Sequence, residues 1–234
     1  MTIVFDGVSL NSIANIHIED IRVSPIEIED TTRPRAINAG SVFVRSRKGT
    51  RTISVTFGLL DENMINRQKF IQAIYQWAKD DREYKLELPG HPDYYLMAVC
   101  TGKPEPSLRQ WWESNLRLVF TCFDNPYYNA IYEKSVACGT QFMVLGDAPP
   151  LMRIERTVSG SAASNQSYSN GSQTMTFSSI PVGDMVIDLN RQTAAVGSTS
   201  IMEYYAPAGS FIIPKTGTQT ISGTGTVKYR ERWQ

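Results

Sequence analysis

Apolar and polar residues alternate along several short stretches in the first half of the chain. In the stretch 51–59, every second residue from position 53 is apolar, namely Ile53, Val55, Phe57 and Leu59. The stretches 83–88, 94–100 and 115–123 show similar alternation. A period of two residues is typical of a strand with one buried face. We therefore predict four strands, with a hairpin at the turn Pro89–Asp93.

The segment 61–80 has a different period. Its apolar residues stand at helical spacing, namely Phe70, Ile71, Ile74, Trp77 and Ala78. Such a stripe is typical of a helix that packs one face against a sheet. Either Asp61 or Asn63 can cap the helix, because each side chain can accept from an exposed amide. The strands and this helix predict an α+β domain over residues 1–134.

Residues 135–234 differ in composition. This half holds 34 Gly, Ser and Thr residues among 100, with only 7 basic and 6 acidic side chains. Such sequence favours short strands joined by tight turns, and the segments with that pattern are 151–158, 174–180, 185–189, 193–196, 211–213, 218–222 and 226–232. We interpret residues 135–234 as a β-sandwich domain. The boundary follows the corner Asp124–Tyr128, where Pro126 stops a strand.

The stretch Ser159–Ser172 consists almost entirely of small polar residues. We predict a mobile loop there, with a contact surface as the other interpretation.

Charge excludes some classes of function. The chain has 23 basic and 23 acidic residues, so it lacks the basic surplus of a dedicated nucleic-acid binder. We see no secretory leader and no apolar run long enough for membrane insertion. Cys100, Cys122 and Cys138 are too few and too scattered for a disulfide framework, so we expect buried free thiols.

No motif in the sequence indicates an enzyme. The two histidines, His17 and His91, have no cysteine or second histidine at metal-ligand spacing, so we expect no metal site. A nucleophile elbow and a phosphate-binding loop are both missing, so we expect no cofactor. The pair Asp80–Asp81 is better interpreted as the end of a helix than as catalytic carboxylates.

One basic cluster stands out, formed by Arg45, Arg47, Lys48 and Arg51. We favour a solvated hairpin tip around Gly49. The alternative is an electrostatic contact with phosphate or with an acidic partner.

The order of several segments along the chain can be compared with that in known protein families. In the first half they are Gly49–Phe57, the helix with Phe70, Ile74 and Trp77, the hairpin Leu86–Gly90 and the corner Asp124–Tyr128. In the second half they are Met185–Asn190, Ala194–Val196, Phe211–Gly217 and the closing strand Val227–Trp233. Over nearly the whole chain, this order resembles the distal tail protein (Dit) family of long-tailed, non-contractile (siphovirus-type) bacteriophages.

The resemblance implies a mostly β chain with one helix: an N-terminal α+β belt-type domain followed by a C-terminal galectin-like β-sandwich. It also implies a structural virion component of the tail tip or baseplate, made in the cytoplasm of the bacterial host. In that family, a hexameric ring joins the tail tube protein to the tail-associated lysin or adhesion protein. The tape measure protein and receptor-binding proteins are further partners that it implies. It carries over no catalytic residue.

We predict that copies of the chain meet through the segment 26–51, because this stretch is long, mixed in polarity and hard to bury within one subunit. The candidate interface residues are Ile26, Arg33, Arg35, Val42, Val44, Arg45, Arg47, Lys48 and Arg51.

The alternative function is a carbohydrate-binding adhesin that uses the C-terminal sandwich. Its candidate sugar or partner contacts are Trp111, Trp112 and Trp233, because aromatic rings stack on sugars. The second half shows no galectin-type set of His, Asn and Arg, which argues against direct glycan binding.

Overall fold

The structure is a computed structural model that describes residues 2–34, 41–60, 63–103, 116–123, 126–206 and 209–234. The chain forms two compact units: an N-terminal unit, Met1–Tyr128 with Gln234, and a C-terminal unit, Asn129–Trp233. The division falls within β10 (Tyr128–Ala130). The boundary predicted from composition, after residue 134, lies a few residues downstream of it.

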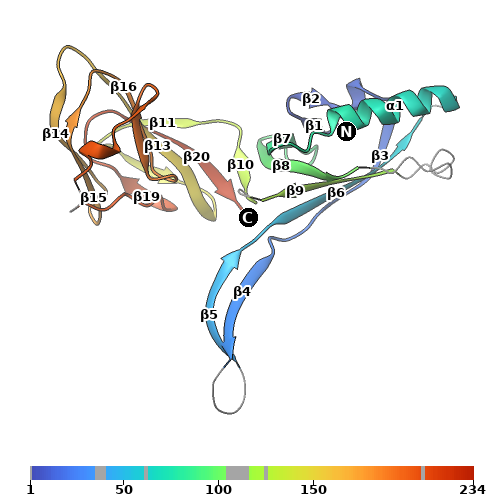
Figure 1. The fold of residues 1–234 in the computed structure, drawn as a ribbon, viewed down its shortest axis with the longest axis horizontal. Coiled ribbons are helices and arrows are strands. Elements are labelled where there is room, and N and C mark those ends of the chain that lie inside the picture. The colour runs from blue at the N-terminus through green and yellow to red at the C-terminus, as the bar shows by residue number, and fades with distance from the viewer. Residues whose placement is uncertain (1, 35–40, 61–62, 104–115, 124–125, 207–208) are drawn as a thin grey trace. The chain divides into compact units, whose positions relative to one another are not determined.

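The N-terminal unit contains one α-helix and nine further strands within the described residues (Figure 1). Its elements are β1 (Val4–Phe5), β2 (Val8–Ser9), the 3₁₀ turn Leu10–Ser12, β3 (Ile16–Val23), β4 (Ile28–Pro34), β5 (Ser41–Lys48), β6 (Arg51–Leu59), α1 (Met64–Trp77), β7 (Tyr84–Glu87), β8 (Tyr94–Gly102) and β9 (Leu116–Cys122).

Seven of these strands make one antiparallel sheet in the order β2-β1-β7-β8-β9-β6-β3. The alternation predicted from sequence is confirmed along β6, where Ile53, Val55 and Phe57 are fully buried. The same holds for β9, where Leu118 and Phe120 are fully buried. One face of the sheet therefore lies against a continuous apolar core.

Helix α1 covers that face. Asn63 caps it as predicted, since its side-chain oxygen accepts from the amide of Ile65 at 2.9 Å. Ile74 and Trp77 are buried, and the Trp77 ring meets the ring of Phe5 edge to face at 5.5 Å between centroids. The Trp77 indole N–H donates to the carbonyl of Val8 at 2.9 Å, so the helix is fixed to the sheet by a polar contact as well.

The strands of the C-terminal unit are β11 (Lys134–Ala137), β12 (Gln141–Val144), β13 (Ala148–Val158), β14 (Ala163–Ser169), β15 (Thr174–Ile180), β16 (Gly183–Asp188), β17 (Thr193–Val196), β18 (Thr199–Ser200), β19 (Gly217–Thr220) and β20 (Thr226–Trp233), with a 3₁₀ turn at Met202–Tyr204. Six of them form an antiparallel sheet in the order β11-β20-β13-β16-β17-β18. The pairs β12–β19 and β14–β15 are separate two-stranded sheets.

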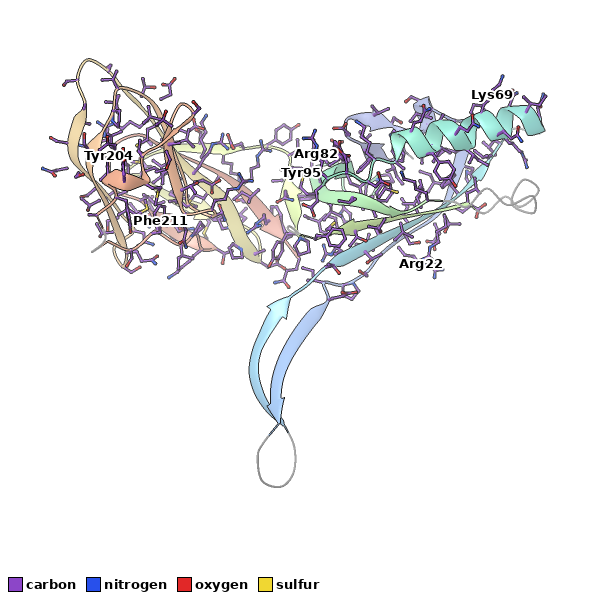
Figure 2. The ribbon with its side chains drawn as sticks, in the orientation of Figure 1. Arg22, Lys69, Arg82, Tyr95, Tyr204 and Phe211 are labelled. Atoms are coloured by element: carbon purple, nitrogen blue, oxygen red, sulfur yellow. The ribbon has the colours of Figure 1, made fainter. Side chains whose placement is uncertain are left out.

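These sheets enclose a second apolar core, as a β-sandwich requires. Its fully buried residues come from both layers and include Ile154, Phe177 and Ile187. Phe211, labelled in Figure 2, is half-buried against this core. Its ring centroid lies 5.0 Å from that of Tyr205. The predicted mostly β architecture with a single helix is therefore observed.

Three local predictions are wrong. The stretch 159–172 is not a loop throughout, because β14 pairs with β15 along its length. Its only buried residue is Tyr168, so the strand is held by backbone pairing rather than by alternating apolar side chains. Conversely, the apolar run 211–213 is not a strand, and its central residue Ile212 is buried as irregular chain. Gly49 is not a hairpin tip: it lies between β5 and β6, opposite Glu27.

Candidate functional site

The groups that carry most enzyme chemistry lie apart in the described residues. His17 is exposed on β3, and His91 sits in the turn before β8, with its ring 4.9 Å from that of Tyr128. Burial raises the pKa of Cys100 to about 11 and that of Cys122 to about 12, so both thiols stay protonated. No group of three metal-binding side chains occurs in this part of the chain.

The Asp80–Asp81 pair is engaged in structural contacts. Asp80 forms an ion pair with Lys103 at 3.1 Å. Asp81 accepts from the hydroxyl of Tyr84 at 2.9 Å, and this hydrogen bond holds the pKa of Asp81 below its ordinary value. Both carboxylates lie shortly after the end of α1 at Trp77, as the sequence interpretation expects.

No helix among the described residues is long and apolar enough to cross a membrane.

The strongest candidate for an assembly surface is the hairpin of β4 and β5, which we call the arm. The two strands pair antiparallel with each other from Ile28↔Lys48 to Pro34↔Ser41, and with no other strand in the described residues (Figure 1). Both edges of the arm thus present unpaired backbone groups, which are a template for pairing with another chain.

The arm continues the ribbon of β3 and β6 in the same register. Val23 lies opposite Ile53 and Ile28 lies opposite Lys48, five residues further on along each strand. Backbone hydrogen bonds close the interval: Glu27 donates to Thr50 at 2.9 Å and accepts from Gly49 at 2.8 Å. The arm therefore continues the direction of β3 and β6 across a short interruption at residues 24–27 and 49–50, where backbone hydrogen bonds hold its base.

The structure brings most of the candidate interface residues onto this ribbon. Arg33 lies on β4, while Val42, Val44, Arg45, Arg47 and Lys48 lie on β5. Ile26 is half-buried just before β4. Arg35 lies outside the described residues.

Arg51 differs from the other candidates, because it is only 5% exposed at the start of β6. Its guanidinium lies 5.0 Å from the centre of the Tyr128 ring, a cation–π contact. In the structure as described, its Nε and Nη1 atoms have no hydrogen-bond partner. Arg51 is therefore a core residue of the N-terminal unit, and it does not belong with the solvated basic cluster.

A second polar site, on the C-terminal unit, was not predicted from the sequence. Alternate residues of β13 point away from the core and meet charged residues of the neighbouring strands, since Arg153 lies opposite both Asp188 and Lys228. Arg153 donates to both Glu133 oxygens at 2.8 and 2.9 Å and to Glu155 at 2.6 Å. Lys228 pairs with Glu155 at 2.7 Å, and hydrogen bonds from Lys228 and Arg153 lower the pKa of Glu155.

We call this outward side the polar face. It comprises Glu133, Leu151, Arg153, Glu155, Asp188, Lys228 and Arg230. Among the candidate sugar contacts, Trp233 is an even number of residues from the buried Val227 and Tyr229 on β20. It therefore lies on the same side of the strand as they do, opposite the polar face. Trp111 and Trp112 lie outside the described residues.

Comparison with known proteins gives matches among solved structures only. No protein-family model matches the sequence, and neither does any curated protein. The chain is similar to the Dit protein (gp 19.1) of phage SPP1, described as a paradigm of the hub adsorption apparatus in phages that infect Gram-positive bacteria. Identity is 16% and the TM-score is 0.77, over 100% of this chain and 99% of the SPP1 protein.

Two phage P2 baseplate structures in the activated conformation also match. The chain from the structure with Ca has a TM-score of 0.42 and 11% identity, over 94% of this chain and 91% of that one. The chain from the structure with Sr has a TM-score of 0.43 and 10% identity, over 98% and 97%. It is the SPP1 match that decides the architecture. The chain has, over its whole length, the fold of a phage Dit hub protein, as the resemblance of its sequence to distal tail proteins predicts.

Proposed function

We propose that this chain is a structural hub protein of a phage tail tip, in which six copies form a closed ring. The observation that carries the proposal is the match of the whole chain to the SPP1 Dit protein, a hub protein of an adsorption apparatus. In this role the ring joins the tail tube protein to the tail-associated lysin or adhesion protein, and the chain is not an enzyme. The tape measure protein and receptor-binding proteins are its further neighbours.

The arm supports the ring. A ring arises from a head-to-tail interface whose rotation closes, so each subunit needs one surface that reaches its neighbour. The arm offers unpaired strand edges over β4 and β5, and backbone hydrogen bonds at Glu27 and Gly49 join it to the ribbon of β3 and β6. We infer that it pairs with the next copy, which also satisfies backbone groups that would otherwise favour aggregation.

The charge balance of the chain is compatible with this role. DNA passes through the tip of a phage tail, and a hub that gripped phosphates would hinder it. With 23 basic and 23 acidic residues, the chain avoids the strong counterion-release binding that a basic surplus brings.

The decisive experiment removes the arm without disturbing its base. Glu27 and Gly49 already face each other across the ribbon, so residues 28–48 can be replaced by an Asn-Gly turn that closes a two-residue hairpin. Tails assembled in cells that supply the full chain should show a sixfold ring at the distal end in electron micrographs. Tails from cells with the shortened chain should lack it.

The exposed strand residue His17 offers a matched control in the same ribbon, and His17→Ala should leave the ring intact. The shortened chain should stay soluble and unfold at the same urea concentration as the full chain. A closed ring built from the shortened chain would overturn the role of the arm. A full-length chain located anywhere but in an annulus at the distal end would overturn the function itself.

A further inference from the structure

The turn between β14 and β15 contains the only Asn-Gly pair in the sequence, Asn170–Gly171. The two strands form a hairpin whose last pair is Ser169↔Thr174, so residues 170–173 close the turn (Figure 1). Gly171 is exposed and has a φ of 89°, a left-handed conformation that glycine adopts without strain. The proposed ring function does not use this turn.

The side-chain carbonyl of Asn170 is held by three donors. Its Oδ1 accepts from the backbone amide of Gln173 at 2.8 Å, and from the amide and the hydroxyl of Ser172, each at 3.1 Å. Donors in this arrangement stabilise negative charge that develops on the oxygen when a nucleophile attacks the carbonyl carbon. The turn therefore activates Cγ of Asn170 in the manner of an oxyanion hole.

The nearest nucleophile along the chain is the backbone nitrogen of Gly171. Its N–H donates to the hydroxyl oxygen of Ser169 at 3.2 Å, which orients the peptide group. Apart from the two neighbouring residues, no heavy atom of the described structure lies within 4 Å of the position where a Cβ of Gly171 would stand. The nitrogen is therefore free of steric hindrance and open to water.

The amide group of Asn170 that would leave is weakly held. Its Nδ2 donates to Oε1 of Gln173 at 3.5 Å, which is beyond the usual length of a good hydrogen bond. The turn thus combines an activated carbonyl carbon, an unhindered nitrogen and a weakly held leaving group.

We propose that Asn170 is a site of spontaneous covalent modification, at which the folded turn promotes deamidation through a succinimide. The backbone nitrogen of Gly171 loses its proton to hydroxide and attacks Cγ of Asn170, which forms an N–C bond and a tetrahedral oxyanion at Oδ1. The Cγ–Nδ2 bond then breaks, and Nδ2 takes a proton from water and leaves as ammonia. Water opens the resulting ring at either carbonyl and gives aspartate or isoaspartate.

The modification changes the turn in two ways. Either product adds a negative charge to residues 135–234, which have only 7 basic and 6 acidic side chains. In isoaspartate, the main chain runs through Cγ and is longer by one carbon, so the contacts of Oδ1 with Ser172 and Gln173 cannot stay as they are. The strand pair next to the turn, Ser169↔Thr174, should then loosen.

The test incubates the full-length chain at mildly alkaline pH and follows each asparagine by peptide mapping with mass spectrometry. Asn170 should convert first, and isoaspartate should appear beside aspartate, because the ring intermediate opens at both carbonyls. Asn165 is the internal control, since it is exposed in the same hairpin and also has a positive φ of 48°, but is followed by Gln166. It should stay intact while Asn170 converts.

Ser172→Ala removes one of the three donors to Oδ1 and should slow the conversion of Asn170 about fivefold, the usual effect of losing one neutral hydrogen bond. Ser178→Ala is the matched control, because this exposed serine of β15 donates to the carbonyl of Tyr204 at 3.2 Å, away from the turn. Its rate should equal that of the unchanged chain. In urea, where the fold of the turn is lost, Ser172→Ala should no longer slow the reaction.

Three results would each overturn the proposal. The first is an Asn170 that survives the incubation or converts no sooner than Asn165. The second is conversion to aspartate alone, which would indicate direct hydrolysis by water. The third is an equal rate in the folded Ser172→Ala and Ser178→Ala variants, which would remove the role of the turn. None of these results bears on the ring, which the arm deletion tests separately.

Discussion

The two halves of one β-ribbon have opposite surroundings in this protein. In the half made by β3 and β6, β6 pairs on both sides and buries Ile53, Val55 and Phe57 in the core. The half made by β4 and β5 continues in the same register and pairs only with itself among the described strands. We call the first half the covered half, because β6 has a paired neighbour on each side and an apolar face in the core. Strands β4 and β5 have only each other as paired neighbours among the described strands.

The largest expected effect lies in the covered half. Phe57→Ala removes a fully buried ring from β6 and should lower the free energy of unfolding by about 3–5 kcal/mol. Urea denaturation of the purified chain measures this loss. His17, exposed on the neighbouring strand β3 and opposite Gly58, provides the control, since His17→Ala should change stability by less than about 0.5 kcal/mol. Equal losses in the two variants would refute the contrast between the faces.

Hydrogen exchange should show the same contrast in the backbone. An isolated two-stranded hairpin is only marginally stable, so the amides of β4 and β5 should exchange at least about a hundredfold faster than those of β6 in the free chain. In assembled tails the difference should shrink, because the arm then gains a partner. Exchange in the arm that is equally fast before and after assembly would contradict its proposed role.

The pH dependence of stability tests whether the thiols of Cys100 and Cys122 are buried in the core of the N-terminal unit. The pKa of Cys100 is raised to about 11 and that of Cys122 to about 12, from an ordinary value of 9.0, because burial disfavours the thiolate. A raised folded pKa means that the contribution is present below pH 9 and is lost as the pH rises through 9 toward 11–12. Each thiol should cost about 1 kcal/mol of stability between pH 8 and pH 10.

Urea denaturation at these two pH values measures the effect. The double variant Cys100→Ala with Cys122→Ala is the control, since both residues then lack a titrating group. Its stability should fall less over the same interval. A fall that matches the unchanged chain would mean that the thiols are not the cause.

The smallest expected effect is at Arg51, at the start of β6, and it is a gain in stability instead of a loss. Arg51→Met keeps the aliphatic contact with Tyr128 but removes the buried Nε and Nη1 donors, which have no hydrogen-bond partner in the described structure. Stability should rise by about 1 kcal/mol, because the cost of the unpaired donors outweighs the cation–π contact. Arg51→Ala should instead be destabilising, because it also loses packing. A loss of more than about 1 kcal/mol in Arg51→Met would show that the guanidinium has a stabilising partner.

Much of the fold can be predicted from the sequence because apolar periodicity reports which residues are covered. The alternation in β6 and β9 and the helical stripe with Ile74 and Trp77 all correspond to buried faces. Apolar periodicity does not predict a strand that is held mainly by backbone hydrogen bonds to its neighbour. Strand β14 contributes only Tyr168 to the core and is otherwise polar, so no hydrophobic pattern marks it.

The candidate interface residues could also be predicted only in part from the sequence. The segment 26–51 stands out in the sequence as long, mixed in polarity and hard to bury within one subunit, and β4 and β5, the strands of the arm, lie within it. The sequence groups Arg51 with the basic residues before it, yet the fold buries Arg51 beside Tyr128. Neighbouring positions in the sequence therefore do not show whether a charged side chain is buried or exposed in the fold.

The sequence by itself determined the strands with apolar faces, the helix and the contrast in composition between the two halves, because local periodicity encodes burial. Only the tertiary structure decided the polar face. Glu133, Arg153, Asp188 and Arg230 are far apart in the chain and meet because β13 lies between β16 and β20. Strand order and register are set by cooperative packing of the whole sheet, and no local pattern contains them.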